Sequence, residues 1–550
     1  MKLRTGSLIV TSIILAVIFL FPPQKAEAQV GGIVSREPRT ASGTAGKVSG
    51  TVRREDDGSV LRKAMVTLAP EGRQMEAVAA RTDGNGKFEF PEVSPGRYQV
   101  RAQRNGYVAQ FFGQRGSGPG LTVTVEPGQN LERIDFRLER AGVVSGSVID
   151  EDNEPVEGVE VRAMRVRFSP GGRERLVTSR TARTDDLGRY RIPSLTPGMY
   201  YLQAGGRGDG VRIGGAISAV GYAMTFYPGV ATREEAQLVQ VTSGNEASRL
   251  ELAVRTTPTY SISGVIADAK PGGGPRRYNI GFASGGGTAM TNADRGDGTF
   301  VLRGLEPGDY NVFAQVWDGD GGPRSGFRNV RILNTDVQIV IEIGAVAAVQ
   351  GEVRADDGKP MSFTGLMVSL QASDDRNVSP SGMIDEKGHF AVSNVPAGAY
   401  SILLASRERD TYLKEARCRG QDALASLITL GAAEVLDDCT FRVARDVGKL
   451  IGAVKRDDKP AEGMLVVLIP VEMERRKIAR HISSAQTDAN GTFEIRGVVP
   501  GDYFAFVVSP SDDASYYQLE FADRNRESAT KLTVKPNELH SVELKMAKSR

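Results

Sequence analysis

DGNGKFEFPEVSPGRY, residues 83–98, is the stretch that decides the fold. It places the aromatic Phe88 two positions after a glycine, and Tyr98, ten residues later, two positions after another glycine. The same arrangement recurs four more times along the chain, ending at Tyr200, Tyr310, Tyr400 and Tyr503. Because identical spacing in five places indicates internal duplication, the sequence predicts an array of one domain type.

Each repeat opens with an apolar residue, a second residue and a glycine, as in Val48-Ser49-Gly50, and apolar positions then alternate, which is typical of a half-buried strand. Asp-rich and Pro-Gly turns separate further short strands, and each repeat closes on a strand with same-face apolar residues such as Ile134, Phe136 and Leu138. Many short strands joined by such turns predict an all-β fold, a tandem array of five Greek-key-like antiparallel β-sandwich domains. The predicted segments are a signal peptide at 1–28, a linker at 29–46 and sandwiches at 47–141, 142–256, 257–345, 346–446 and 447–550.

The three recurring patterns together, V-x-G, D-x-x-G-x-F and P-G-x-Y, resemble the carboxypeptidase regulatory-like domain. That family belongs to a wider group of transthyretin-like and collagen-adhesin B-type sandwiches, which is classed with carbohydrate-binding-like folds. The tyrosine at the strand start also resembles the corner tyrosine of Greek-key sandwiches, which packs its ring inward and bonds its hydroxyl to backbone. The resemblance covers about residues 47 to 546 and implies a non-catalytic module, but it names no ligand.

The first residues have the features of an export signal. Lys2 and Arg4 precede the apolar run Leu8 to Phe21, and Ala26-Glu27-Ala28 is a small-x-small cleavage site. We therefore expect cleavage near Ala28, no transmembrane segment in the mature chain, and a location that is secreted, periplasmic or at the cell surface. A net charge of +2 gives no electrostatic reason to expect nucleic acid as a partner.

The sequence offers little for catalysis. His389 lies in the repeated turn, His481 in a strand-like segment and His540 near a final turn, and no two of them have the short spacing of a zinc site. No nucleophile-elbow pattern occurs, so we expect no enzyme activity, no metal centre and no cofactor. The Asp pairs of the opening turns, such as Asp56 with Asp57, leave calcium open as a ligand, although a hairpin turn favours Asp for backbone reasons alone.

The two cysteines, Cys418 and Cys439, could form a disulfide in an oxidising compartment. Cys439 stands where other repeats have a core Ile, Leu or Val, so a buried free thiol is an equal alternative.

Aromatic residues outside the repeated pattern are the best candidates for binding. Exposed rings could stack on sugars, and Trp317, Tyr227 and Tyr517 are the predicted contacts, although packing into the sandwich is the alternative for each ring. The sequence thus favours a secreted, non-enzymatic multidomain protein that binds carbohydrate of a polysaccharide or envelope glycan. The alternative is a structural spacer or adhesin that binds an envelope or extracellular protein through exposed sheet edges. Solvent-facing aromatic clusters would favour sugars, whereas buried rings beside an unblocked edge strand would favour protein pairing.

Overall fold

The structure, a computed structural model, describes residues 44–545 with several gaps. Within that range it leaves out 72–75, 117, 169–171, 173, 206–211, 214–215, 218–219, 269–277, 285–286, 293–297, 317–323, 345, 374–378, 407–409, 425 and 510–513. The predicted signal peptide at 1–28 therefore lies outside the described residues.

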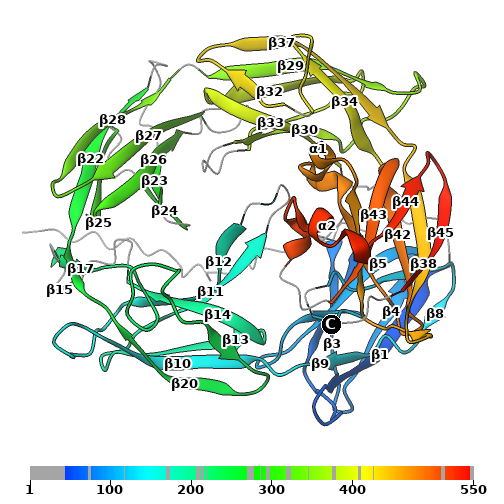
Figure 1. The fold of residues 1–550 in the computed structure, drawn as a ribbon, viewed down its shortest axis with the longest axis horizontal. Helices are drawn as coiled ribbons and strands as arrows, with labels where there is room; N and C mark the ends of the chain where they lie inside the picture. The colour runs from blue at the N-terminus through cyan, green and yellow to red at the C-terminus, as the bar shows by residue number, and fades with distance from the viewer. Residues whose placement is uncertain are drawn as a thin grey trace, which may run out of the picture. The chain divides into compact units, whose positions relative to one another are not determined.

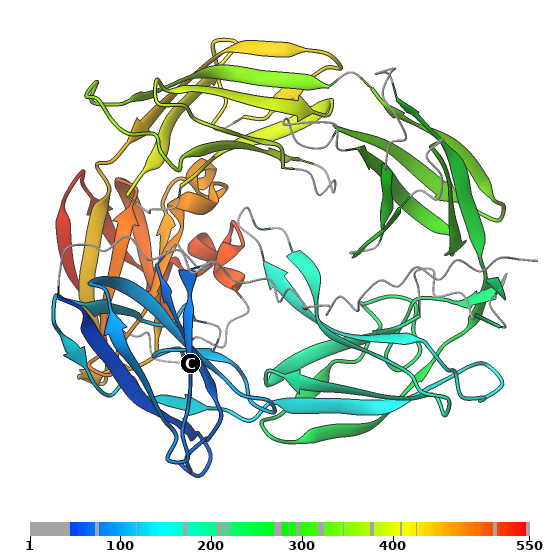
Figure 2. The ribbon, with the colours of Figure 1, turned by 180° about the vertical axis from the view of Figure 1, so that it is seen from behind.

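Nearly every regular element is a strand, and the strands of one repeat lie together in both ribbon views (Figures 1 and 2). The first repeat has β1 (Gly46–Arg54), β2 (Met65–Pro70), β3 (Val78–Arg81), β4 (Lys87–Val93), β5 (Gly96–Gln103), β6 (Gln110–Phe111), β7 (Thr122–Val125), β8 (Asn130–Leu131) and β9 (Phe136–Leu138). The second has β10 (Gly142–Ile149), β11 (Glu160–Phe168), β12 (Glu174–Arg183), β13 (Arg189–Leu195), β14 (Gly198–Ala204), β15 (Arg212–Ile213), β16 (Ala216–Ile217), β17 (Val220–Tyr222), β18 (Thr225–Phe226), β19 (Val239–Val241), β20 (Glu246–Ala253) and β21 (Thr256–Pro258).

The strands of the remaining three repeats have the following bounds. The third has β22 (Tyr260–Asp268), β23 (Tyr278–Ser284), β24 (Gly287–Asn292), β25 (Thr299–Leu305), β26 (Gly308–Val316), β27 (Arg324–Ile332) and β28 (Val337–Ile343). The fourth has β29 (Ala347–Ala355), β30 (Met367–Ala372), β31 (Ser381–Met383), β32 (His389–Val395), β33 (Gly398–Ala405), β34 (Tyr412–Cys418), β35 (Gln421–Asp422), β36 (Ile428–Leu430) and β37 (Val435–Ala444). The fifth has β38 (Gly448–Arg456), β39 (Lys459–Pro460), β40 (Leu465–Pro470), β41 (Ser483–Gln486), β42 (Thr492–Val498), β43 (Gly501–Val508), β44 (Thr530–Val534) and β45 (Leu539–Lys545).

Two main sheets form in each repeat, with two additional two-stranded sheets in the second repeat, and the first main sheet is built on the opening strand. That strand pairs antiparallel with the strand of the repeated aromatic, and in all five repeats the opening glycine lies opposite that aromatic: Gly50 and Phe88, Gly146 and Tyr190, Gly264 and Phe300, Gly351 and Phe390, Gly452 and Phe493. On its other side the opening strand pairs with the closing strand of the same repeat, and this pairing is parallel. The predicted all-β sandwich class is confirmed, but the sequence did not reveal the parallel pair.

Glycine stands at the opening position for a steric reason. A Cβ at Gly146 would overlap the backbone carbonyl of Leu250 on the closing strand, and the other four opening glycines face the carbonyls of Ile134, Ile339, Cys439 and Val542 in the same way. A side chain there would push the closing strand away from the sheet, so glycine permits the close approach of the two backbones. The V-x-G pattern therefore marks a position where the backbone of the last strand lies close beside that of the first.

The corner tyrosine makes the same hydrogen bond in every repeat. Each hydroxyl donates to the backbone carbonyl four residues earlier, at 2.6 to 2.8 Å: Tyr98 to Ser94, Tyr200 to Thr196, Tyr310 to Glu306, Tyr400 to Pro396 and Tyr503 to Val499. All five rings are buried. This confirms the expected role of the tyrosine, which fixes the turn before its strand while its ring fills the core.

Five separate apolar clusters make up most of the core. Each consists of inward-facing residues from the strands of one repeat. The buried members run from Val48 to Leu138, Val144 to Val254, Ile262 to Ile343, Ala347 to Val443 and Leu450 to Leu544. Each cluster lies inside one of the predicted sandwich ranges. The ranges themselves stay a prediction about domain boundaries.

The fourth repeat departs from the others in the strand that follows the corner-tyrosine strand. In the first, third and fifth repeats this strand pairs within the second sheet, as β27 pairs with β26, and in the second repeat the later strand β18 pairs there with β14. In the fourth repeat β34 pairs instead with the closing strand β37 and extends the first sheet to the order β32-β29-β37-β34-β35.

The fifth repeat carries short helices that the sequence analysis did not predict. They are α1 (Met473–Arg476), α2 (Phe521–Arg524) and the 3-10 turns η2 (Ala479–His481), η3 (Ser515–Tyr517) and η4 (Arg526–Ser528). All six residues of β40 are buried, because the face turned away from the main cluster packs Phe504, Phe506 and Ala522 in a second one. The guanidinium of Arg476 is nearly fully buried and binds the Asp523 carboxylate with both nitrogens, at 2.7 and 3.1 Å, which ties α1 to α2.

Candidate binding surfaces

The three predicted sugar contacts lie in different surroundings. Trp317 lies outside the described residues. Tyr227 precedes Pro228, and its partly buried ring packs against the core of the second repeat. Tyr517 lies in η3 and is partly exposed, with its ring centroid 4.6 Å from that of Tyr516. The structure does not bring Tyr227 and Tyr517 together as one site, and stacking on a sugar stays a prediction for all three.

Most of the other aromatics outside the repeated pattern are used in packing. Tyr107 and Phe112 pack on the first core and Tyr222 on the second, while Phe226 and Tyr412 are buried outright. The phenol of Tyr412 donates to Asp446 at 2.9 Å. Phe111 lies on the outward face of the first repeat under the guanidinium of Arg101, which is 5.8 Å from the ring centroid. Within the described part of the chain these rings thus do not form a cluster on one exposed surface.

The histidines do not converge. His389 is exposed, and its Nδ1 lies 3.5 Å from a carboxylate oxygen of Asp385. His540 lies in β45. The expectation of a strand at His481 is wrong, because the residue ends the 3-10 turn η2 and is buried. Burial, together with Arg475 and Arg480, lowers the pKa of His481 to about 4, so the ring is neutral at neutral pH. No group of three or more His, Cys, Asp or Glu among the described residues is arranged to hold a metal ion.

The acidic opening turns use their carboxylates locally. Asp57 accepts the backbone N–H of Ser59 at 2.8 Å, and hydrogen bonds from that residue lower the pKa of Asp57 to about 2. Asp150 accepts two backbone N–H groups at 3.0 and 2.9 Å, and Asp357 accepts one at 3.1 Å. Hydrogen bonds to the backbone N–H groups of the turn are therefore a sufficient reason for Asp at these positions.

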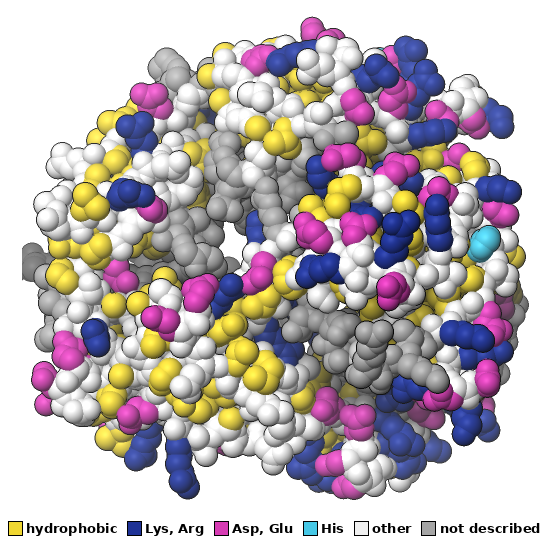
Figure 3. Space-filling view, in the orientation of Figure 1, with side chains coloured by type: hydrophobic (Ala, Val, Ile, Leu, Met, Phe, Trp, Pro, Cys, Tyr) yellow, Lys and Arg dark blue, Asp and Glu magenta, His cyan; other side chains and the backbone are white. Residues whose placement is uncertain are grey.

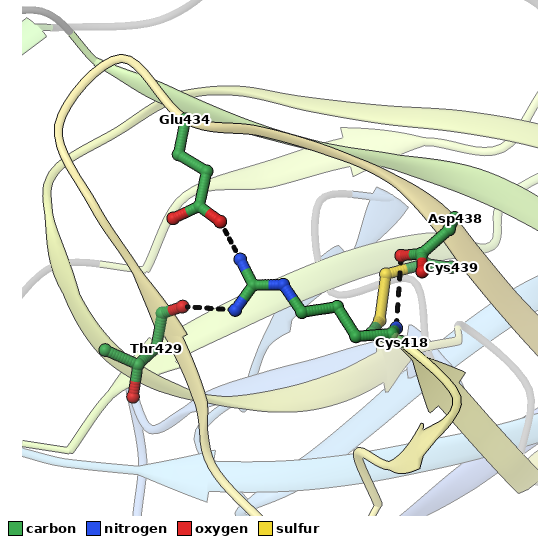
Figure 4. The surroundings of a disulfide bond; sticks show 6 residues. Cys418, Thr429, Glu434, Asp438 and Cys439 are labelled. Carbon is green, nitrogen blue, oxygen red and sulfur yellow. Dashed lines mark hydrogen bonds and ion pairs between the residues drawn. A yellow bond between two sulfur atoms is a disulfide. The ribbon is translucent and has the colours of Figure 1, made fainter.

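Cys418 and Cys439 are joined in a disulfide, and both are buried (Figure 4). They are cross-strand neighbours, because β34 and β37 run antiparallel and Arg417 lies opposite Thr440. The next residue, Arg419, binds around the bond: its N–H donates to Asp438 at 3.1 Å, and its guanidinium donates to the Thr429 carbonyl at 3.3 Å and pairs with Glu434. The disulfide and Arg419 together fasten the strand that has changed sheets.

One edge strand is unlike the others. β12 is ten residues long, pairs only with β11 within the described residues, and has no buried residue. The strands in the same place in the other repeats have three to six residues. β14 pairs with β11 only as far as Met164, so the ends of β11 and β12 continue beyond the sheet as a two-stranded arm. Sequence reasoning missed this strand, although the long interval between Glu160 and Asp185 was a signal for it.

The family comparison agrees with the fold. The carboxypeptidase regulatory-like domain matches residues 47–139 and again residues 143–248. A mouse protein, BOS complex subunit NOMO1, is 27% identical over 129 residues, which is 23% of this chain and 10% of that protein. The chain thus spans about a tenth of the length of this curated relative.

The solved structures that match this chain are only distantly similar to it. GBS52, a minor pilin of Streptococcus agalactiae, is 13% identical with a TM-score of 0.23, over 39% of this chain and 97% of the pilin. A streptococcal ancillary pilin is 10% identical with a TM-score of 0.20, over 53% of this chain and 100% of the pilin. None of the helices in the described residues is long and apolar enough to cross a membrane. From the repeated glycine and tyrosine geometry and the two family matches, the chain carries carboxypeptidase regulatory-like domains at residues 47–139 and 143–248.

Proposed function

We propose that the chain is a non-catalytic scaffold protein that binds another protein through an exposed sheet edge, and that β12 is the main edge. The observation that carries the proposal is the combination of a ten-residue edge strand and the largely inward packing of the aromatics that would have stacked on sugars. An edge strand has backbone N–H and C=O groups available to a further strand, and natural proteins usually shorten or cover such an edge.

The side chains of β12 indicate what the partner strand would carry. The strand exposes three basic residues, Arg175, Arg180 and Arg183. Its single acidic residue is Glu174, whose carboxylate already pairs with Arg233. An extended segment with acidic side chains would complement this edge, with backbone hydrogen bonds supplying affinity and the arginines selectivity. Between Ala163 and Met164 of β11 the register shifts, so Ser179 is a bulge that divides the edge into two short runs.

Export to an oxidising compartment belongs to the same proposal. The buried Cys418–Cys439 disulfide supports it, because such bonds persist mainly outside the cytosol. The predicted cleavage near Ala28 would release the repeats there.

Photo-cross-linking tests the edge directly. A photoreactive residue replaces Val177, which is 45% exposed on the edge strand β12, and in a control protein it replaces Val265, which is 44% exposed on β22, a strand paired on both sides. On intact source cells we expect one protein adduct at Val177 and none at Val265. Addition of that purified partner should then slow amide hydrogen exchange along β12. Equal adducts at both positions, or no protection of β12, would contradict the proposal.

Carbohydrate binding is the second candidate, and the close pair of partly exposed rings at Tyr516 and Tyr517 favours it. Two adjacent rings could present an apolar surface to a sugar. Pull-down of the exported chain on insoluble polysaccharides, beside Tyr517→Ala and Trp317→Ala, tests this. Retention that the aromatic truncations abolish would support stacking, and retention that they leave unchanged would exclude these rings as the site.

A further inference from the structure

The outward face of the second sheet of the first repeat gathers basic side chains. Val66, Leu68, Val100 and Ala102 are buried in the core, so the alternate residues of β2 and β5 point away from it. The strand registers place these outward residues in two cross-strand rows. One row is Arg81, Met65 and Gln103, and the next is Ala79, Thr67, Arg101 and Phe111.

Two further cations lie at the end of this face. Arg104 follows the last residue of β5, and its guanidinium donates to the backbone carbonyl of Lys63 at 3.5 Å. We call Lys63, Arg81, Arg101 and Arg104 the basic face. These four residues, with Gln103, Asn105 and Tyr107, line one side of an open surface cavity.

The charge of the basic face is not balanced by neighbouring carboxylates. Among the described residues no acidic side chain forms an ion pair with any of its four cations. At the other end of the same sheet Arg97 pairs with Glu71 at 2.6 Å, and in the third repeat Arg331 pairs with Asp309. Basic and acidic side chains are interspersed over the molecular face drawn in Figure 3, in keeping with a net charge of only +2. Uncompensated like charges on one sheet face disfavour folding, so a partner that neutralises them gives a reason for their presence.

Comparison with the other repeats shows that the fold does not require a cation here. Arg101 stands three residues after the corner tyrosine Tyr98, and the other repeats have Gln203, Phe313, Leu403 and Phe506 at that position. In the fifth repeat Phe506 is buried against Phe521 of α2, so that face is closed. The second repeat has Arg183 at the place of Arg81, so it is the cation at the Arg101 position that is particular to the first repeat.

We infer that the basic face binds an acidic polysaccharide, a polymer whose sugar units carry carboxylates. Guanidinium groups bind carboxylates through two parallel hydrogen bonds, and the amides of Gln103 and Asn105 offer donors and acceptors for hydroxyls. The ring of Phe111 holds the Arg101 guanidinium in place, which lowers the entropy lost on binding. Cations spaced along an open face suit a polymer that repeats its charge, because several weak contacts then act together.

The same face is a poor site for a protein partner. Protein interfaces depend on large apolar side chains that enter packed pockets. The large apolar side chains among the outward residues are Met65 and Phe111, and Phe111 lies under a guanidinium. This inference rests on different residues from the edge pairing proposed for β12, except that Arg180 of β12 lines the other side of the same cavity. The experiments keep the two apart, because the variants below change Arg81 and Arg101 and leave β12 intact.

Binding of the whole exported chain to immobilised polygalacturonate tests the inference, with neutral dextran and polyglutamate as comparison polymers. The test protein is Arg81→Glu/Arg101→Glu. The matched control is Arg303→Glu/Arg328→Glu, which changes the net charge equally at two exposed arginines of the third repeat. We expect wild type to bind polygalacturonate more tightly than either other polymer. The affinity for polygalacturonate should fall by about tenfold or more in the test protein and by less than about twofold in the control.

A conservative pair separates guanidinium recognition from charge alone. Arg81→Lys/Arg101→Lys keeps the charge but loses the two-bond geometry, so its affinity should fall between those of wild type and the Glu variant. Raising the salt concentration should weaken binding of wild type. Equal loss in the test and control proteins, equal binding of polyglutamate and polygalacturonate, or no binding of polygalacturonate by wild type would each overturn the inference.

Discussion

Reduction of the Cys418–Cys439 disulfide is expected to loosen the fourth repeat and leave the other repeats unchanged. The two cysteines are separated by 21 positions, and closing a loop of that length contributes about 3 kcal/mol by removing entropy from the unfolded chain. The loss should be local, because β34 is held to its sheet by β37, the two-residue β35 and this bond. Local opening of β34 that becomes easier by that amount should raise amide exchange there roughly 100-fold.

Hydrogen exchange with mass spectrometry, on the whole chain with and without reductant, measures this repeat by repeat. Amides of β34 should exchange faster, and amides of β5 in the first repeat should keep their rates. The double variant Cys418→Val/Cys439→Val, which keeps apolar groups in the core, separates loss of the cross-link from loss of buried side chains. Unchanged exchange in β34 after verified reduction, or equal acceleration in all five repeats, would refute the loop-closure reasoning.

Three further predictions concern single residues. Gly146→Ala should cost about 1–3 kcal/mol in denaturant unfolding, because the new methyl group would overlap the Leu250 carbonyl, whereas Gly84→Ala, with nothing within 4 Å of its Cβ, should be nearly neutral. Tyr503→Phe removes a buried hydroxyl that makes two hydrogen bonds and should cost about 1–3 kcal/mol, seen as faster amide exchange in the fifth repeat. His481 has a pKa of about 4 in the folded chain against 6.5 in the unfolded one, so the unfolded chain binds more protons between these values and stability should fall by up to about 3 kcal/mol as pH drops from 6.5 to 4. Substitution of His481 by Gln should flatten that pH dependence, and an unchanged slope would contradict it.

The features that recur in sequence were the ones that could be predicted. A corner tyrosine and a V-x-G glycine depend on local spacing and on a backbone contact that every repeat shares, so five copies make both visible. The switch of β34 to the other sheet was not visible, because β34 itself lies outside the repeated pattern, although its partner β37 is the repeated closing strand. The helices of the fifth repeat are four residues or shorter, and α1 and α2 are joined by the Arg476–Asp523 contact, which no sequence periodicity predicts.

The candidate surfaces were harder to predict, for a physical reason. Whether an aromatic ring stacks on a ligand or packs inward depends on which face of a strand it occupies, as the rings of Tyr107 and Tyr222 illustrate. Arg101 could have been noticed by comparing the residue three places after each corner tyrosine. Its lack of an acidic partner among the described residues is a property of the folded sheet.

The parallel pairing of first and last strands has a mechanical consequence. The chain enters each repeat at the start of the opening strand and leaves at the end of the closing strand, so tension along the chain slides the two strands past one another. The backbone bonds between them are then loaded in shear and must break together. In the third repeat this pair is continuous from Ile262 and Val337 to Asp268 and Ile343. In the first repeat the closing strand is divided into β8 and β9, which pair with β1 at two and three positions. Under a pulling force the first repeat should therefore yield before the third.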